Sequence, residues 1–258
     1  MHRRRTPRAA DVAPRDARHI QACVRADRGH SPRIAGDPPI ELPLATGAAG
    51  RLRGPCDGRV AICLGGGVAA SVPGVWNASL EWLADHLEER HPELGFLEVR
   101  YRIRSWRDMG PCIEDAAAAL AAAASGGARE IVLIGFSMGG AVAVGVAAHP
   151  LVDQVIGLAP WLSDRLDVSP LRGRRLDVLH GSLDRWFPGI PGVPASLSKR
   201  GVERARALGV PTSYRLVHGG VHGIAGRTSR GLVRFPRAGA WLQGVEHALS
   251  RTLPRGGD

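Results

Sequence analysis

Ile-Val-Leu-Ile-Gly-Phe-Ser-Met-Gly-Gly-Ala-Val-Ala-Val, residues 131–144, is the segment that says most about the fold of this chain. Its first four residues are large and apolar, which is typical of a strand buried on both faces. Its last residues are small and apolar, which favours a helix packed closely against a sheet. Between these runs lies the pattern Gly-x-Ser-x-Gly, from Gly135 to Gly139. The segment therefore predicts a strand, a tight turn and a buried helix, with Ser137 at the corner.

The glycines of this pattern have a steric purpose. A strand that turns abruptly into a helix holds its corner residue in strained dihedral angles, and side chains two positions before or after it would collide with neighbouring backbone. Gly135 and Gly139 remove those side chains. The pattern alone is weak evidence for function, and its value comes from the strand and helix on either side.

The rest of the chain alternates short apolar runs with longer stretches of helical spacing. Such alternation is typical of a parallel sheet covered by helices on both faces. The predicted fold class is therefore α/β, with a mostly parallel sheet. We predict strands over residues 60–64, 96–101, 130–135, 154–159, 175–180 and 213–217. We predict helices over residues 78–90, 112–124, 138–148, 197–208 and 237–250.

Length and composition divide the chain into two parts. It has 258 residues, of which 44% are apolar, enough to bury a sizeable core. Residues 1–38 show no apolar periodicity, and we expect them to form a disordered or loosely docked extension before a folded domain at residues 39–258. The first 40 residues hold nine arginines and four aspartates, a large share of the chain's net charge of +10.

The charge and the apolar runs exclude several classes of protein. Lys199 is the only lysine among 34 basic residues, which indicates a compositional bias rather than a phosphate-binding design, so nucleic-acid binding is not favoured. No apolar run approaches the roughly 20 residues that cross a bilayer. No secretory signal follows the N-terminal arginines, and the four cysteines lack the spacing of a disulfide framework or zinc site. We therefore expect a cytoplasmic protein, and the oligomeric state stays open.

A serine acts as a nucleophile only with a base and a third group that orients the base. His222 follows the last predicted strand in a glycine-rich loop, and His218, four residues earlier, is its rival. Asp184 follows the strand before, and the rival acids Asp164 and Asp167 follow residues 154–159. All lie after the carboxyl ends of predicted parallel strands, the edge at which active sites form. We favour His222 as the base and Asp184 as the acid.

With the order Ser137, Asp184, His222, the chain resembles serine hydrolases of the α/β-hydrolase superfamily, in particular lidless enzymes similar to dienelactone hydrolase and carboxylesterases. The resemblance covers roughly residues 60–249. It implies that Ser137, on a nucleophile elbow, attacks an acyl carbonyl. His222 then moves the proton, and Asp184 holds the imidazole as the third member of a catalytic triad. It also implies a small-molecule acyl substrate and no metal or organic cofactor.

The same resemblance implies an oxyanion hole. One donor is the backbone N–H of Met138, and the other comes from the loop after the first predicted strand. That loop contains Gly66 and Gly67, of which we take Gly66, although the choice between them stays open. Leu64 stands where the family often has a histidine. His180, beside Gly181, matches a common pattern at a strand end and implies a structural role.

Three of the six tryptophans, Trp106, Trp161 and Trp186, each follow a different predicted strand on its carboxyl side. They are candidates for the wall of an acyl pocket, and packing under helices is the alternative. Arginines accompany them on the same edge and favour an anionic substrate, unless they are merely solvated; these are Arg104, Arg107, Arg165 and Arg185. The short interval between residues 159 and 175 leaves no room for a helical lid, so we expect an open site.

The sequence thus predicts a serine hydrolase that cleaves an ester or thioester of a small to medium acyl substrate through an acyl-enzyme. Its activity is expected to rise with pH as His222 loses its proton. A serine peptidase or amidase of the same fold is one alternative. A ligand-binding protein on a hydrolase scaffold without catalysis is another.

Overall fold

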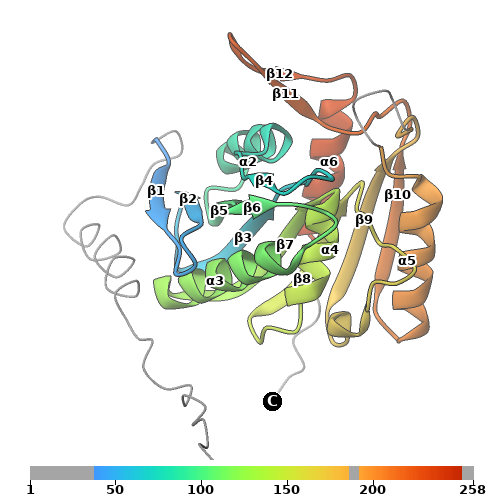
Figure 1. Cartoon of the computed structure of the whole chain (residues 1–258), viewed down its shortest axis with the longest axis horizontal. Helices are drawn as coiled ribbons and strands as arrows, with labels where there is room; N and C mark the ends of the chain where they lie inside the picture. Colours follow the sequence, from blue (N-terminus) through green and yellow to red (C-terminus); the bar gives the residue numbers. More distant parts are fainter. Residues whose placement is uncertain (1–37, 186–191, 252–258) are drawn as a thin grey trace, which may run out of the picture.

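The computed structural model describes residues 38–185 and 192–251, and Figure 1 shows a central twisted sheet with helices on both faces. Eight strands form the sheet in the order β1-β2-β5-β3-β7-β8-β9-β10. Pairing is parallel from β5 to β10, and β1 and β2 add an antiparallel edge. The bounds are β1 (Ile40–Pro43), β2 (Ala49–Arg53), β3 (Gly58–Leu64), β5 (Leu94–Arg100), β7 (Ala128–Phe136), β8 (Val152–Leu158), β9 (Arg175–Gly181) and β10 (Thr212–Val217).

The predicted α/β fold class is confirmed. All six predicted strands are present and form the parallel part of the sheet, with bounds that differ by no more than a few residues. The order of strands places β3 and β7 in the middle, where both faces are covered. Fully buried residues such as Ile131, Val132 and Leu133 are therefore apolar without interruption.

Strand β2 of the antiparallel edge was not predicted because two of its inward residues are charged. Arg51 and Arg53 of β2 are nearly buried and both donate to the carboxylate of Glu98 on β5, at 2.7–3.1 Å. A buried charge is tolerated only when it is paired in this way. Because these inward positions hold arginines paired with a glutamate, β2 lacks the alternation of apolar and polar residues that predicts a strand from sequence.

Five helices cover the sheet, and their positions follow the predicted ones closely. Strand residues of β7 alternate between the two cores: Ile131 and Leu133 pack with α3, α4 and α5, whereas Val132 and Ile134 pack with α2 and α6. A short 3-10 turn at Ser169–Leu171 follows β8 in place of a helix. The helices are α2 (Ala78–Arg90), α3 (Gly110–Gly126), α4 (Met138–Val146), α5 (Ala195–Ala207) and α6 (Ala238–Leu249).

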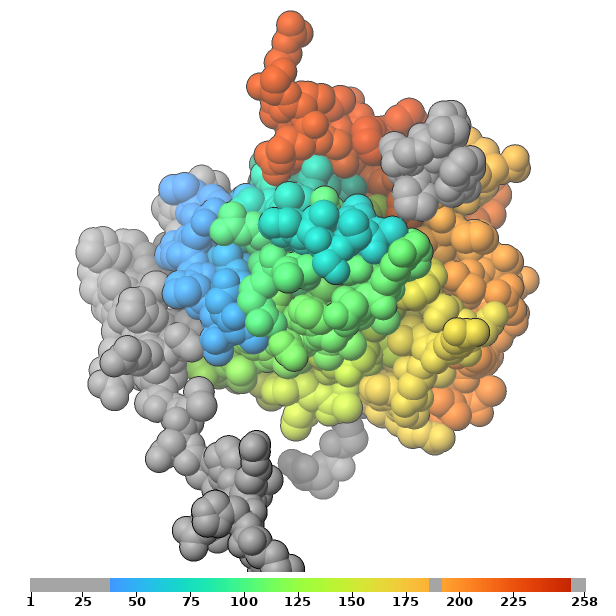
Figure 2. All heavy atoms as spheres, viewed as in Figure 1, coloured from blue at the N-terminus to red at the C-terminus, as the bar shows by residue number. Residues whose placement is uncertain are grey.

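Two small antiparallel pairs lie outside the main sheet. The strands β4 (Val72–Pro73) and β6 (Ile103–Arg104) join the segments that follow β3 and β5. The strands β11 (Ala225–Thr228) and β12 (Gly231–Arg234) form a hairpin that stands out from the body of the molecule (Figures 1 and 2). The hairpin contacts α2 and begins three residues after His222. Neither pair was predicted, because such short strands carry too little apolar periodicity.

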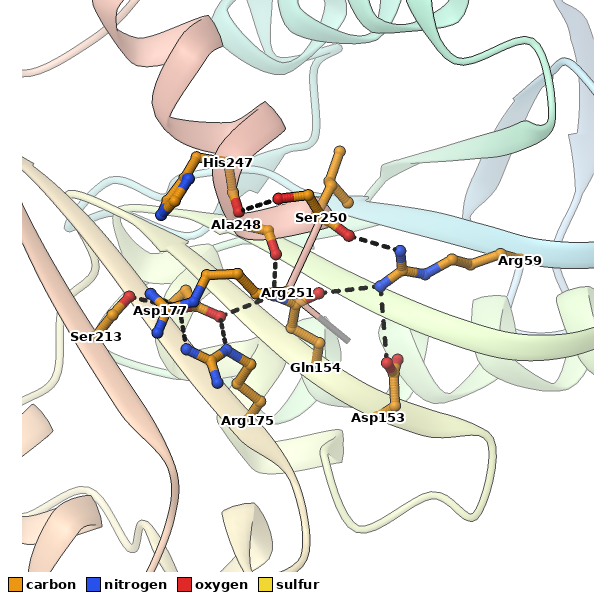
Figure 3. Close-up of polar contacts among 11 residues, drawn as sticks. Arg59, Asp153, Gln154, Arg175, Asp177, Ser213, His247, Ala248, Ser250 and Arg251 are labelled. Carbon is orange, nitrogen blue, oxygen red and sulfur yellow. Dashed lines mark hydrogen bonds and ion pairs between the residues drawn. The ribbon is translucent and has the colours of Figure 1, made fainter. Parts of the chain in front are cut away.

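A buried polar network ties the end of α6 to the amino ends of the sheet strands (Figure 3). Arg59 on β3 donates to the carbonyl oxygen of Leu249 at 2.8 Å. Gln154 on β8 donates to the carbonyl oxygen of Ala248 at 2.8 Å and to Asp177 at 2.7 Å. The last carbonyl groups of a helix lack partners within the helix, so these two side chains act as its cap. The network lies at the edge of the sheet opposite Ser137.

Within the described ranges, no helix combines the length and the apolar content needed to cross a bilayer. The extension expected at residues 1–38 lies outside the described residues except for Pro38. The division of the chain at that point stays a prediction.

Candidate active site

Ser137 sits at a sharp corner between β7 and α4. Its backbone has φ 55° and ψ −119°, a conformation that is strained for a residue with a side chain. A Cβ atom on Gly139 would overlap the carbonyl oxygen of Leu64, and one on Gly135 would overlap the backbone of Gly139. The two glycines thus allow the close approach of strand and helix that the sequence pattern predicted.

His222 places its two ring nitrogens between a hydroxyl and a carboxylate. Its Nε2 lies 3.1 Å from Oγ of Ser137, and its Nδ1 lies 2.7 Å from Oδ2 of Asp184. A carboxylate only accepts hydrogen bonds, so Nδ1 carries the proton and the neutral ring leaves Nε2 free to accept one from the serine. The ring of Phe136 packs against the imidazole, with 5.0 Å between centroids. This arrangement fixes both the tautomer and the orientation of the base.

Asp184 is held in the turn after β9 with its carboxylate fully buried. Oδ1 accepts from the backbone N–H of Val193 at 2.9 Å, and Oδ2 faces both His222 and His180. Burial alone would raise the pKa of Asp184, but the hydrogen bonds from His180 and His222 outweigh burial and hold the pKa below its ordinary value. The carboxylate is therefore ionised at neutral pH.

The rival residues weighed from the sequence lie elsewhere. His218 is exposed to solvent. Asp164 is exposed and forms an ion pair with Arg200 at 3.0 Å, and Asp167 accepts from the backbone and hydroxyl of Ser169 at 2.8–2.9 Å. The structure therefore brings together Ser137, His222 and Asp184 and leaves the other three out.

The loop after β3 runs beside Ser137, as the expected oxyanion hole requires. A Cβ atom on Gly66 would lie 3.3 Å from Cβ of Ser137, whereas one on Gly67 would overlap the side chain of Met138. Gly66 is thus the glycine that adjoins the serine. Met138 is the first residue of α4, and the first N–H groups of a helix have no acceptor within it. Both expected donors therefore lie next to Ser137.

Two of the three candidate tryptophans lie together near Ser137. The backbone N–H of Trp161 donates to the carbonyl oxygen of Ser137 at 2.9 Å. The rings of Trp106 and Trp161 are half-buried, tilted by 59° and 6.2 Å apart between centroids. The guanidinium of Arg107 lies 5.5 Å from the ring centroid of Trp106. Trp186, the third candidate, lies outside the described residues.

The loop that carries Trp161 is held by contacts that sequence reasoning missed. Ala159 has φ 45°, and Pro160 fills the space above Gly140 and Gly157. Further along, the guanidinium of Arg204 on α5 donates to four backbone carbonyl groups, at 2.6–3.2 Å. These belong to Leu162, Ser163, Asp164 and Leu166. No local pattern relates an arginine to a loop 40 residues earlier, so only the folded chain reveals this clamp.

The arginines expected at this edge differ from those of β2 in having no carboxylate beside them. Within residues 38–185 and 192–251, none of the four forms an ion pair. Three of them, Arg107, Arg165 and Arg185, are exposed, and Arg104 is half-buried. A solvated role for these arginines and a role in binding an anionic substrate both stay predictions.

The polar groups around Ser137 are engaged with one another. Among the residues that the structure describes, no group of three His, Cys, Asp or Glu side chains is placed to hold a metal ion. The expectation that the chain uses no metal or organic cofactor stays a prediction.

Comparisons with known proteins agree with this architecture. No family model and no curated protein matches the sequence. Among solved structures, an α/β hydrolase from a Medee basin deep-sea metagenome library is similar at 19% identity and a TM-score of 0.55, over 72% of this chain and 84% of that chain. A dienelactone hydrolase-like promiscuous phosphotriesterase from metagenomic libraries is similar at 17% identity and a TM-score of 0.57, over 82% and 96%. A thermophilic esterase from Thermogutta terrifontis is similar at 17% identity and a TM-score of 0.57, over 83% and 91%.

Proposed function

We propose that this chain, which has the α/β-hydrolase fold, is a serine hydrolase that cleaves an ester or thioester of a small to medium acyl substrate. The observation that carries the proposal is the continuous pair of hydrogen bonds from Ser137 through His222 to Asp184. Each of the three side chains comes from the carboxyl end of a different strand, so the arrangement depends on the whole fold. The solved structures to which the chain is similar include esterases and hydrolases.

The first half of the reaction acylates the serine. Oγ of Ser137 attacks the carbonyl carbon while Nε2 of His222 removes the hydroxyl proton. The imidazolium that forms is stabilised by the ionised carboxylate of Asp184. When the tetrahedral intermediate collapses, His222 returns the proton to the leaving alcohol or thiol, and an acyl-enzyme remains.

Two backbone N–H groups stabilise the negative oxygen of that intermediate. In the proposal these belong to Met138, the residue after Ser137, and to Gly66, which adjoins the side chain of Ser137. The positive end of the dipole of α4 points at the same place. Donors fixed before the reaction starts need no reorganisation when charge develops, and one such donor is worth roughly 2.7–4 kcal/mol of transition-state stabilisation.

The second half of the reaction uses water. His222, neutral again, removes a proton from a water molecule that attacks the acyl carbonyl of the ester on Ser137. Collapse of the second tetrahedral intermediate gives the free acid, and Ser137 takes the proton back from His222. The half-buried rings of Trp106 and Trp161 contact each other, and Trp161 is joined to Ser137 through its backbone; in the proposal this pair serves as the wall for the acyl chain.

The experiment that tests the proposal measures turnover of a panel of p-nitrophenyl esters, thioesters and anilides, together with labelling by a fluorophosphonate probe. We expect labelling and a burst of p-nitrophenol with the wild-type chain, and neither with Ser137→Ala. Ser229→Ala, at the exposed tip between β11 and β12, is the matched control and should behave as wild type.

The panel also separates the alternatives. Turnover of anilides in preference to esters would replace the esterase assignment by an amidase. Absence of both labelling and turnover in the folded wild-type chain would leave a binding protein on a hydrolase scaffold and would overturn the proposal.

A further inference from the structure

A second histidine contacts the carboxylate of Asp184. His180 lies near the end of β9, four residues before Asp184, and its ring is fully buried. Its Nε2 lies 3.2 Å from Oδ2 of Asp184 and 2.8 Å from the carbonyl oxygen of Val193. Both of these oxygens only accept hydrogen bonds. Nε2 therefore carries a proton and donates it between them.

The other nitrogen of His180 faces a buried hydroxyl. Oγ of Ser198, on α5, lies 2.8 Å from Nδ1 of His180. The same Oγ lies 3.0 Å from the carbonyl oxygen of Ala195, which also accepts from the hydroxyl of Tyr214 at 3.1 Å. The hydroxyl hydrogen of Ser198 therefore has two acceptors within reach, the carbonyl oxygen of Ala195 and Nδ1 of the neutral imidazole. The two acceptors at Nε2 thus set the tautomer of His180, and Ser198 is a polar partner for the other nitrogen.

Asp184 consequently accepts from three donors on three sides. Val193 holds Oδ1, and His222 and His180 share Oδ2. A carboxylate held in this way cannot rotate without breaking a buried hydrogen bond, which carries a large cost. We propose that His180 is a positioning residue that keeps the Asp184 carboxylate turned toward His222, through an Nε2 proton held between that carboxylate and the carbonyl oxygen of Val193. The inference rests on the proposed function, because it concerns the acid of that triad.

The contact has a consequence for the pH dependence of the reaction. Among the described residues, the titratable group in contact with His180 is Asp184, which also contacts His222, and α5 contributes the uncharged Ser198, whose hydroxyl lies 3.3 Å from that of Tyr214 on β10. Because His180 shares Oδ2 with His222, part of the negative charge is already neutralised by a donor. Loss of His180 leaves Oδ2 to the imidazolium of His222 alone. The base then holds its proton more firmly, and the carboxylate is less well fixed.

The test compares graded variants of this contact. His180→Leu removes the donor, His180→Gln keeps an amide N–H in its place, and Ser198→Ala removes only the hydroxyl beside Nδ1. Ser213→Ala is the matched control, since Ser213 lies near the start of the neighbouring strand β10 and bonds Asp177 on β9 rather than His180 or Asp184. Folding of each variant is checked by circular dichroism and thermal unfolding. The pH profiles of kcat and kcat/KM are measured with one ester, and ring-nitrogen NMR follows His180 and His222 through the same pH range.

For His180→Leu we expect kcat to fall roughly tenfold to hundredfold, the worth of a hydrogen bond to a charged group. KM should change little, and the acid limb of the kcat/KM profile should move to higher pH. Recovery of much of the wild-type profile is expected in His180→Gln, a smaller move in Ser198→Ala and no move in Ser213→Ala. The NMR signals of His180 in the wild type should report protonated Nε2 and bare Nδ1.

A folded His180→Leu variant with the wild-type kcat and pH profile would overturn the inference while leaving the hydrolase intact. An NMR spectrum that places the proton of His180 on Nδ1 alone would overturn it as well. Should His180→Leu fail to fold, His180→Gln and Ser198→Ala decide the question by the same measurements. If the wild-type chain shows neither turnover nor probe labelling, the proposed function fails, and the NMR titration of His222 in wild type and variants still decides the positioning role.

Discussion

The backbone N–H of Trp161 donates a hydrogen bond to the carbonyl oxygen of Ser137, at 2.9 Å. The loop after β8 is thereby joined directly to the strained corner of the site. Because the donor is a backbone group, the link survives any change of the tryptophan side chain. The indole can therefore be tested as part of the acyl pocket without disturbing the serine.

Replacing this indole should change substrate preference more than basic reactivity. In Trp161→Ala we expect fluorophosphonate labelling of Ser137 at close to the wild-type rate. The value of kcat/KM for a butyrate ester should fall about tenfold or more relative to an acetate ester, because a longer acyl chain loses apolar contact area. Trp106→Ala, which removes the other ring of the pair, should act in the same direction. An equal loss for both esters would contradict the pocket assignment.

The guanidinium of Arg204 should contribute more to stability and to activity than that of Arg200 on the same helix. Arg204 donates to four carbonyl groups of the loop that contains Trp161, whereas Arg200 makes one exposed ion pair with Asp164. Arg204→Met is expected to lower the free energy of unfolding by about 1–3 kcal/mol and to lower kcat/KM. Arg200→Met should leave both nearly unchanged, because exposed ion pairs contribute little. Urea unfolding and ester kinetics measure the two effects, and similar losses in both variants would contradict the clamp.

The same substitution should lower kcat strongly at Asp184 and leave kcat unchanged at Asp164, the other aspartate considered as the acid. Asp184→Asn keeps the size of the side chain but removes the charge that stabilises the imidazolium of His222, and it favours the wrong tautomer. By analogy with other serine triads, kcat should fall about 10³–10⁴-fold. Asp164→Asn should retain wild-type kcat because the carboxylate of Asp164 pairs with the exposed Arg200 and does not contact His222. Steady-state kinetics of the pair decide the assignment, and a large loss in Asp164→Asn would reverse it.

Protein stability should depend on pH through Asp153, at the amino end of β8. Burial and the neighbouring Glu130 carboxylate raise the pKa of Asp153 to about 6, although Arg59 acts in the opposite direction. In the unfolded chain an aspartate has a pKa of about 3.9. Between about pH 4 and pH 6 the folded chain therefore binds more protons at Asp153 than the unfolded chain does. This contribution to stability is therefore fully present below about pH 4 and is lost as pH rises through about 6.

Asp153→Asn removes this titration. The free energy of unfolding of the variant minus that of the wild type should be larger at pH 7.5 than at pH 4.5, as measured by urea unfolding at the two pH values. A difference between variant and wild type that stays constant across this range would contradict the assignment.

The sequence predicted the parts of the molecule in which local pattern and buried environment agree. The run ending at Ser137 is buried on both faces, so its apolar residues identify β7, and the glycines beside it identify the turn. Asp184 and His222 could be placed at the same edge because parallel strands present their carboxyl ends together. Both Asp164 and Asp184 lie between Ser137 and His222 along the chain, and Asp184 was preferred because it follows the strand directly before the one that leads to His222. The structure places Asp184 beside His222.

Other parts depend on contacts that no local pattern contains. Strand β2 escaped prediction because Arg51 and Arg53 point inward, and only the facing Glu98 makes their burial tolerable. For His180 the sequence implied only a structural role, by resemblance to the family. Its proximity to Asp184 depends on the turn after β9, and its Nδ1 faces Ser198 from a helix that follows later in the chain. Such relations join residues whose spacing along the sequence follows no periodicity.

Rapid-quench mass spectrometry of the chain during hydrolysis of p-nitrophenyl butyrate would test the proposed chemistry directly, because it detects the acyl-enzyme itself. We expect a transient mass increase of one butyryl group, mapped by peptide sequencing to Ser137 and absent from Ser137→Ala. Turnover with no acyl adduct on Ser137, or turnover that persists in Ser137→Ala, would show that the serine is not the nucleophile.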